Sequence, residues 1–218
     1  MAQVFHPSMN TVARATIFGA VFIVGTLGYI VSVVDRSPYQ TDEGIARNQP
    51  VPFSHEHHVR GLGLDCRFCH TSVESSHFAG IPPTKICMTC HSKIWTDAPL
   101  LEPVRASWRE NKPLSWTRVH NLPDFVYFNH SIHIAKGVGC ATCHGPIDHM
   151  PLTAQFASLQ MRWCLDCHRD PAQYLRPKDQ VFNMNYEMPS NQHEIGEGLV
   201  KTENIKVGQL TNCYICHR

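Results

Sequence analysis

Ten cysteines and fifteen histidines dominate the chemistry available to this chain. The cysteines form five pairs with a two-residue gap, and a histidine follows each pair directly. The motifs are CRFCH at 66–70, CMTCH at 87–91, CATCH at 140–144, CLDCH at 164–168 and CYICH at 213–217. Disulfides, zinc ribbons and thioredoxin-like pairs have no need of that histidine. A c-type haem needs it, because the two thiols bond the vinyl groups and the next residue binds iron.

We therefore expect five covalently bound haem c groups. The thioether bonds would come from Cys66, Cys69, Cys87, Cys90, Cys140, Cys143, Cys164, Cys167, Cys213 and Cys216. The proximal iron ligands would be His70, His91, His144, His168 and His217. The formal net charge of +1 does not suggest nucleic acid binding, and we find no Gly-rich phosphate loop or nucleophile elbow.

A second axial ligand on each iron would make it six-coordinate. A repeated F-x-H-x-x-H segment offers histidines three residues apart, which lie on similar sides of a helical turn and can reach two different haems. These are His55 and His58 in the first copy and His130 and His133 in the second. A lone histidine follows in each copy, namely His77 and His149. Methionine is the other possible ligand, with Met150, Met184 and Met188 as candidates. We expect His120 and His193 to make polar contacts, and His57 to point away from its neighbours' face.

The elements that position these residues are expected to be short. We expect a mostly irregular, haem-packed domain with short α-helices ending at the motifs, almost no sheet and one N-terminal transmembrane helix. The expected division is 1–14 cytoplasmic N-terminus, 15–34 anchor, 35–52 linker, 53–92 two-haem module, 93–127 connector, 128–170 second two-haem module, and 171–218 C-terminal segment with the fifth haem. Residues 171–212 are expected to be loop-like, and PVRASWREN to form a short helix.

The anchor is the uncharged run ATIFGAVFIVGTLGYIVSVV, Ala15–Val34. Twenty helical residues span about 30 Å, the thickness of a bilayer core. The run is longer than the roughly 7–15 residues of a signal-peptide core. Haem is attached after export, so we expect a single-pass protein of the bacterial inner membrane with a cytoplasmic N-terminus and a periplasmic haem domain.

The two copies resemble the class III multihaem cytochromes c of the c7 and c3 type. The resemblance implies that the first histidine of F-x-H-x-x-H binds the haem of its own motif and the second binds the next haem. His55 would then serve the haem on Cys66 and Cys69, and His58 the haem on Cys87 and Cys90. His130, His133 and His149 would serve the third, fourth and fifth haems, with His77 competing for the third.

The anchor, the five motifs and PLSWTRVHNLPDFVYFNHSIH (113–133) together resemble the pentahaem subunits of bacterial alternative complex III. The resemblance implies an electron-transfer subunit of a quinol:electron-acceptor oxidoreductase, with no catalytic site of its own. Its partners would be an iron–sulfur subunit related to molybdoenzymes and polytopic quinol-binding membrane subunits. A monohaem cytochrome c, a copper protein or an oxidase would accept the electrons.

Three alternatives are open. A related quinone reductase complex has a similar subunit, but typically with six haems. A stand-alone quinol dehydrogenase of the NapC/NrfH type usually has four haems and a methionine soon after the first motif, where this chain reads CRFCHTSVE. A multihaem reductase would use Cys-x-x-Cys-Lys at its active haem, and this sequence has no such motif.

Overall fold

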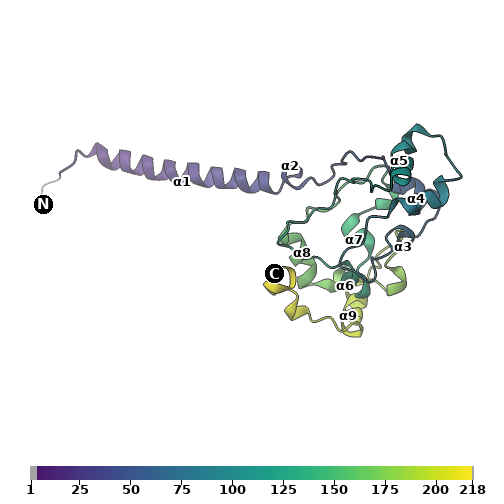
Figure 1. Cartoon of the computed structure of the whole chain (residues 1–218). Coiled ribbons are helices and arrows are strands. Elements are labelled where there is room, and N and C mark those ends of the chain that lie inside the picture. The colour runs from purple at the N-terminus through teal and green to yellow at the C-terminus, as the bar shows by residue number, and fades with distance from the viewer. Residues whose placement is uncertain (1–3, 218) are drawn as a thin grey trace. The chain divides into compact units, whose positions relative to one another are not determined.

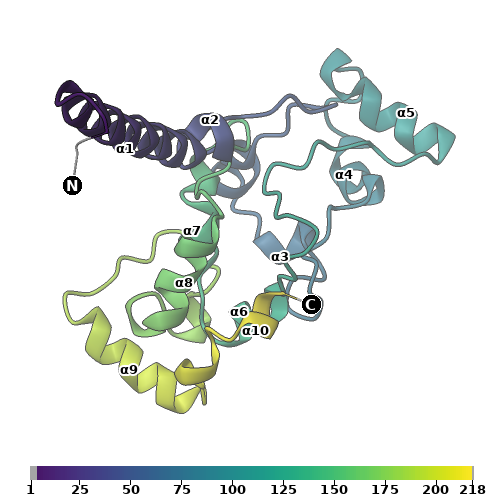
Figure 2. The same ribbon diagram turned by 90° about the vertical axis from the view of Figure 1, so that its left-hand side faces the viewer.

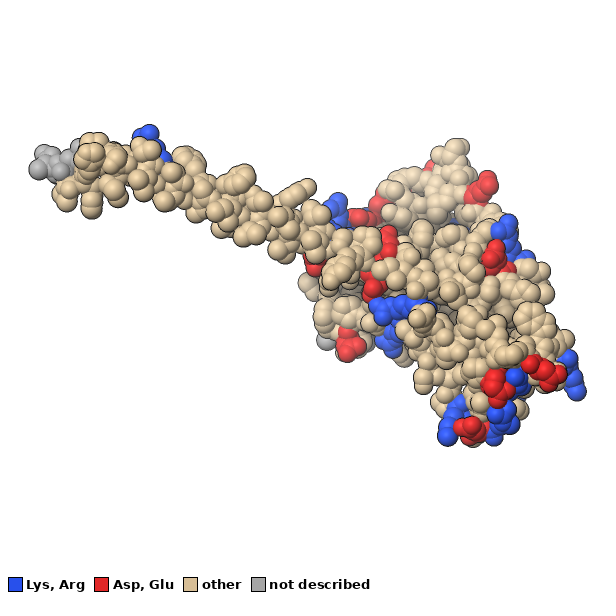
Figure 3. Space-filling view, turned by 90° about the horizontal axis from the view of Figure 1, so that it is seen from above, with Lys and Arg blue, Asp and Glu red and all other residues tan. Residues whose placement is uncertain are grey.

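The computed structural model describes residues 4–217, and the chain divides into two compact units that meet between Asp42 and Glu43. The first unit holds α1 (Ser8–Asp35) and the short α2 (Pro38–Thr41) (Figure 1). Figure 3 shows α1 free of acidic and basic side chains along most of its length. By length and composition α1 is a candidate membrane span, since its 28 residues extend about 42 Å. It begins seven residues before the predicted run.

The second unit is built from short helices joined by irregular chain (Figure 2). Its α-helices are α3 (Cys66–Cys69), α4 (Thr84–His91), α5 (Glu102–Glu110), α6 (His130–Ala135), α7 (Cys140–His144), α8 (Met161–Arg169), α9 (Gln192–Thr202) and α10 (Cys213–Cys216). A π-helix, η1 (Glu56–Gly61), and five 3₁₀ turns complete it: η2 (Pro99–Leu101), η3 (Ile147–His149), η4 (Pro171–Gln173), η5 (Lys178–Gln180) and η6 (Val207–Gln209). Residues 4–217 contain isolated β-bridges and no extended strand. The predicted fold class is confirmed.

Every Cys-x-x-Cys pair lies within one helical turn, as a rigid two-thiol spacing requires. Helices α4 and α7 end at the motif histidines His91 and His144. In α3 and α10 the histidine follows the last helical residue, and its backbone N–H still bonds to the first cysteine's carbonyl. The glycine after His144 has φ +63°, and a Cβ there would lie 2.3 Å from the Phe156 ring, so this close approach needs glycine.

The two copies of F-x-H-x-x-H share their geometry. Phe53 meets the ring of His55 edge-on, with ring centres 4.9 Å apart, and stacks on His58 at 4.4 Å. Phe128 meets His130 and His133 in the same ways, at 4.7 and 4.5 Å. The phenylalanine therefore supports both histidines of its copy.

The copies differ in the helix that carries the histidines. The first copy is the π-helix η1, whereas the second is the α-helix α6. The first spacer to Cys-x-x-Cys-His is one residue longer, and a π-turn contains more residues per turn than an α-turn. The wider turn thus accommodates the extra residue while the histidine rings keep their places.

The hydrophobic core is thin. Among the described residues, only Leu175 and Val181 are large side chains with less than 2% of their surface exposed. One small cluster joins Val51, Leu101 and Val104, and packs against α4 at Cys87 and Met88. Many large apolar side chains near the motifs are exposed, including Phe68, Phe78, Ile94 and Trp95. Side chains alone therefore bury little apolar surface in this unit.

The C-terminal segment is more ordered than the sequence suggested. The expectation of a loop over 171–212 was wrong, because α9 occupies eleven of these residues and packs on η4. Its Gly196 lies so close to the Ala172 carbonyl that any side chain would collide with it. The expected short helix at PVRASWREN is confirmed as α5.

Candidate functional site

None of the ten cysteines forms a disulfide, and we number their five motifs as site 1 to site 5 in chain order. Burial raises the pKa of the thiols of Cys143 to about 12 and of Cys167 to about 11. Cys66 of site 1 and Cys140 of site 3 share a thiol–thiol hydrogen bond, which lowers the pKa of Cys66 to about 7 and raises that of Cys140. Among residues 4–217, no cluster of three or more His, Cys, Asp or Glu side chains is arranged to hold a bare metal ion.

Four of the five motif histidines have their Nδ1 fixed by a backbone carbonyl. The Nδ1–H of His70 donates to Gly80 O at 2.7 Å, and that of His91 donates to Ile94 O at 3.4 Å. The Nδ1–H of His168 donates to Leu210 O at 3.0 Å, and that of His217 donates to Phe125 O at 3.2 Å. This bond selects the tautomer in which Nε2 carries a bare lone pair. Metal-binding histidines characteristically have such a partner, so Nε2 is prepared to bind iron.

Three further histidines face motif histidines at a spacing that fits one iron. The ring centres are 6.3 Å apart for His58 and His91, 6.4 Å for His130 and His144, and 6.1 Å for His133 and His168. A metal–imidazole bond is about 2 Å long, so two imidazoles on opposite faces of one metal have ring centres about 6 Å apart. These pairs therefore have the spacing at which two histidines would hold one iron, at sites 2, 3 and 4.

The partners in these pairs also have a fixed Nδ1. His58 Nδ1–H donates to Ser54 O at 2.8 Å, and His133 Nδ1–H donates to Asn129 O at 2.7 Å, the same bond in each copy. His130 Nδ1–H donates to His77 O at 3.0 Å. Burial lowers the pKa of all three imidazoles, which favours the neutral form that binds metal.

The proposed ligands of sites 1 and 5 are placed less completely. Burial lowers the pKa of His55 to about 4, and the neighbouring His70 of site 1 contributes to that shift. His149 belongs to η3, which packs against η1, and its Nδ1–H donates to the buried Asp148 at 3.1 Å. His77 lies against α6, where its carbonyl accepts the His130 bonds. The pairings of His55, His149 and His77 stay predictions.

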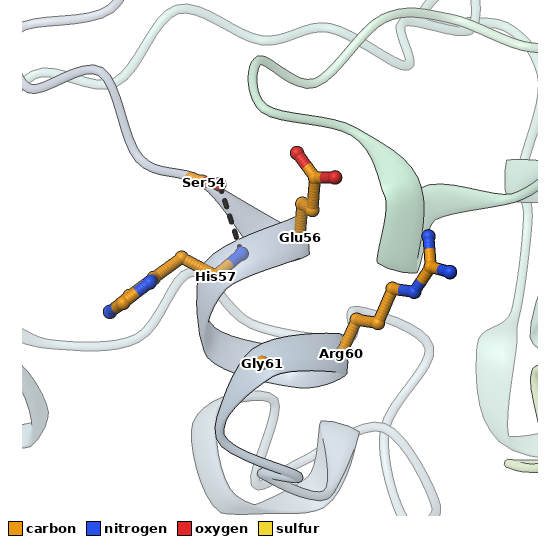
Figure 4. A pocket seen from close by; sticks show the side chains of 5 residues that line it. All are labelled: Ser54, Glu56, His57, Arg60 and Gly61. Carbon is orange, nitrogen blue, oxygen red and sulfur yellow. Dashed lines mark hydrogen bonds between the residues drawn. The ribbon is translucent and has the colours of Figure 1, made fainter.

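The candidate methionines stay predictions as well. Met184 lines a shallow groove with Cys66, Met188 is exposed, and Met150 accepts a backbone hydrogen bond from Glu56. His193 has Nε2 3.3 Å from Asp170 and Nδ1 3.8 Å from Glu197, so both its nitrogens face carboxylates. His57 points away from Glu56 and Arg60 in the pocket that they line (Figure 4).

Two residues whose roles the motifs did not indicate pack against site 3: His120, for which we expected a polar contact, and Arg176. His120 packs its ring edge-on against His144 with centres 4.3 Å apart, and His120 Nε2 and His144 Nδ1 are both buried without a hydrogen-bond partner. Arg176 is 4% exposed and lies against Gly139, next to Cys140. Its guanidinium donates to Asn183 O at 3.2 Å and lies over the Tyr186 ring. Neither residue lies within a Cys-x-x-Cys-His or F-x-H-x-x-H motif, so the sequence pattern does not mark it.

These observations fit covalently bound haem. Each site offers two thiols on one helical turn, and the motif histidines of sites 1, 2, 4 and 5 have a directed Nε2. At site 3 burial lowers the pKa of His144 to about 3, so that imidazole is neutral at physiological pH. The exposed apolar side chains beside the motifs are the kind of surface that a porphyrin covers.

The comparisons with known proteins agree with this donor set. Residues 126–218 match the family model for cytochrome c7 and related cytochrome c. The chain is also 29% identical over 177 residues to the menaquinone reductase, multihaem cytochrome c subunit of Nitratidesulfovibrio vulgaris, which covers 79% of this chain and 78% of that protein. These similarities support covalently bound haem c and a likeness to multihaem cytochromes of quinone-linked membrane complexes.

Proposed function

We propose that this chain is a membrane-anchored pentahaem c-type cytochrome that transfers electrons within a quinol-linked oxidoreductase. The ten cysteines and the five motif histidines would hold five haem c groups. Bound haem supplies iron that cycles between the ferrous and ferric states. The N-terminal helix would hold the haem domain at the outer face of the bacterial inner membrane.

The observation that carries the proposal is the pairing of histidine rings 6.1 to 6.4 Å apart at three sites. Two imidazoles on one iron leave no open position for a substrate. Residues with this arrangement stabilise both oxidation states and let electrons pass, but they do not bind or transform a small molecule. We therefore assign no catalytic residue to sites 2, 3 and 4, and we propose the same for sites 1 and 5 from the predicted pairings of His55 and His149.

Two quinone-linked complexes are candidates for the assembly. The five motifs and the 113–133 segment favour the alternative complex III type, in which electrons leave quinol for a periplasmic acceptor. The similarity to the menaquinone reductase subunit favours a complex in which electrons move toward the quinone. We propose the alternative complex III type because five motifs predict five haems, whereas the reductase typically has six. Its partners would be an iron–sulfur subunit, polytopic quinol-binding subunits, and a monohaem cytochrome c, copper protein or oxidase as acceptor.

The test uses the complex isolated from membranes with a tag on this chain. A haem-to-chain ratio of five, low-spin absorption and co-purification of polytopic and iron–sulfur subunits are expected. Oxidation of added quinol with reduction of this chain's haems would support the alternative complex III role. Reduction of quinone by the pre-reduced complex, without the reverse reaction, would assign the reductase role instead. Isolation of the chain without partners would contradict both.

A further inference from the structure

The hydrogen bonds and ring pairs that hold the five sites also connect the sites to one another, in an order that differs from chain order. Sites 3 and 4 are joined most directly. His130 and His133 lie three residues apart on α6, and their rings face His144 of site 3 and His168 of site 4. One helical turn therefore spans these two sites.

Sites 1 and 2 are joined in the same manner. His58 faces His91 of site 2, and Phe53 packs on both His58 and His55. His55 has the edge-on contact to its phenylalanine that His130 has in the second copy. By that repeat geometry His55 faces site 1, and η1 spans sites 1 and 2.

Sites 1 and 3 meet through the loop that follows site 1. His70 of site 1 donates to Gly80 O, and the backbone N–H and Nδ1–H of His130 both donate to His77 O. The backbone N–H of Ser131 also donates to Ser76 O, at 3.2 Å, across this junction. The loop that follows site 1 therefore lies against α6, which carries the proposed ligand of site 3.

Sites 4 and 5 meet through the segment that precedes α10. His168 of site 4 donates to Leu210 O at 3.0 Å, only three residues before Cys213 of site 5. In Figure 1 α4 lies on the opposite side of the unit from the marked C-terminal end of the chain. Figure 2 also places α4 and α10 well apart.

We propose that the five attachment sites form one line in space, in the order 2, 1, 3, 4, 5, with α4 and α10 at its ends. This proposal rests on the proposed pentahaem function. A separate observation marks the same two ends: of the ten cysteines, Cys90 on α4 and Cys213 on α10 are exposed, while the other eight are partly buried. The rate of electron transfer falls steeply with distance. Electrons therefore enter and leave this chain at the sites nearest to its partners, those on α4 and α10.

X-ray diffraction at the iron absorption edge from crystals of the haem-loaded protein tests the order without relying on activity. Five iron positions are expected, each assigned by its adjoining cysteines. The nearest neighbour of the site 2 iron should be that of site 1, and the sites 2 and 5 should be the most widely separated pair. Five irons with site 2 next to site 3 or site 5 would overturn the order alone. Fewer than five irons would overturn the pentahaem function and the order together.

Two matched variants test the consequence in solution. Cys140→Ala with Cys143→Ala removes the middle site, and Cys213→Ala with Cys216→Ala removes an end. Each variant should hold four haems by absorbance. After flash reduction with less than one electron per chain, redistribution between the pair of sites 2 and 1 and the pair of sites 4 and 5 should lose its fast phase in the middle variant, although exchange within each pair stays fast. In the end variant, redistribution among all four remaining haems should keep its fast phase. The same loss in both variants would overturn the proposed line. If the middle variant does not fold, the iron positions decide.

Discussion

Removing one imidazole from one site should open one coordination position and no more. His58 and His57 are adjacent residues of η1 with different surroundings. His58 faces His91 at 6.3 Å and stacks on Phe53, whereas His57 has its ring 6.1 Å from that of Trp95 and lies in an open pocket. His58→Ala should therefore leave site 2 five-coordinate, and His57→Ala should leave every site six-coordinate.

The expected size of the effect follows from these contacts. His58→Ala should let one carbon monoxide bind per chain, a fifth of the haem, after reduction. In the oxidised protein, a high-spin absorption band should also appear, with the intensity expected for one fifth of the haem. The lost stacking on Phe53 should lower the free energy of unfolding by about 1 kcal/mol. Carbon monoxide titration of the reduced protein and denaturant unfolding measure these two effects.

Free imidazole provides the control for His58→Ala. Added imidazole should restore the low-spin spectrum of oxidised His58→Ala, while His57→Ala should stay low-spin and bind no carbon monoxide with or without it. Our assignment of His58 would be refuted if His58→Ala stayed fully low-spin or if His57→Ala opened a site. A double variant, His57→Ala with His58→Ala, shows whether the neighbouring ring has moved in to replace the lost ligand.

Three further outcomes follow from the structure. Burial depresses the pKa of His55 to about 4, so the unfolded chain binds more protons than the folded chain as the pH falls from 6.5 toward 4. The free energy of unfolding should therefore be greatest above pH 6.5 and fall across that window. Denaturant midpoints at pH 7 and pH 5 measure this change. Arg176→Ala should lower the free energy of unfolding by about 2 kcal/mol, because it removes buried hydrogen bonds and the contact with Tyr186, whereas the exposed Arg109→Ala should change it little. Residues 4–36 can be replaced by a cleavable export signal in a chain produced without its proposed partner subunits. This replacement should release the haem domain from membranes into the soluble fraction with its absorption spectrum unchanged, and a protein that stays with the membranes would contradict the anchor.

The sequence predicts most of the haem chemistry because that chemistry is local. Two thiols and an imidazole within five residues form a site by themselves, so the motifs could be read without a fold. The histidines at F-x-H-x-x-H are also local, since a helical turn determines which way they point. The expected fold class followed from the same reasoning, because so many motifs leave few residues for a conventional core.

What the sequence did not predict depends on contacts between distant residues. The carbonyls of Gly80, Leu210 and Phe125 accept bonds from motif histidines 10, 42 and 92 positions away, and any residue type supplies a carbonyl. Helix α9 has no haem motif, and its packing on η4 depends on a close approach at Gly196. The buried Arg176 escaped notice because an arginine in a polar segment is ordinarily exposed.

The thin core bears on how this protein is made. A chain with so few buried apolar side chains has little to drive collapse before its cofactors are bonded, so the maturation machinery meets an extended polymer. Such machinery can recognise only what neighbouring residues display. The proximal histidine must therefore lie within the same five-residue motif as the two cysteines. The second histidine is selected later, when folding brings it to the other side of each iron.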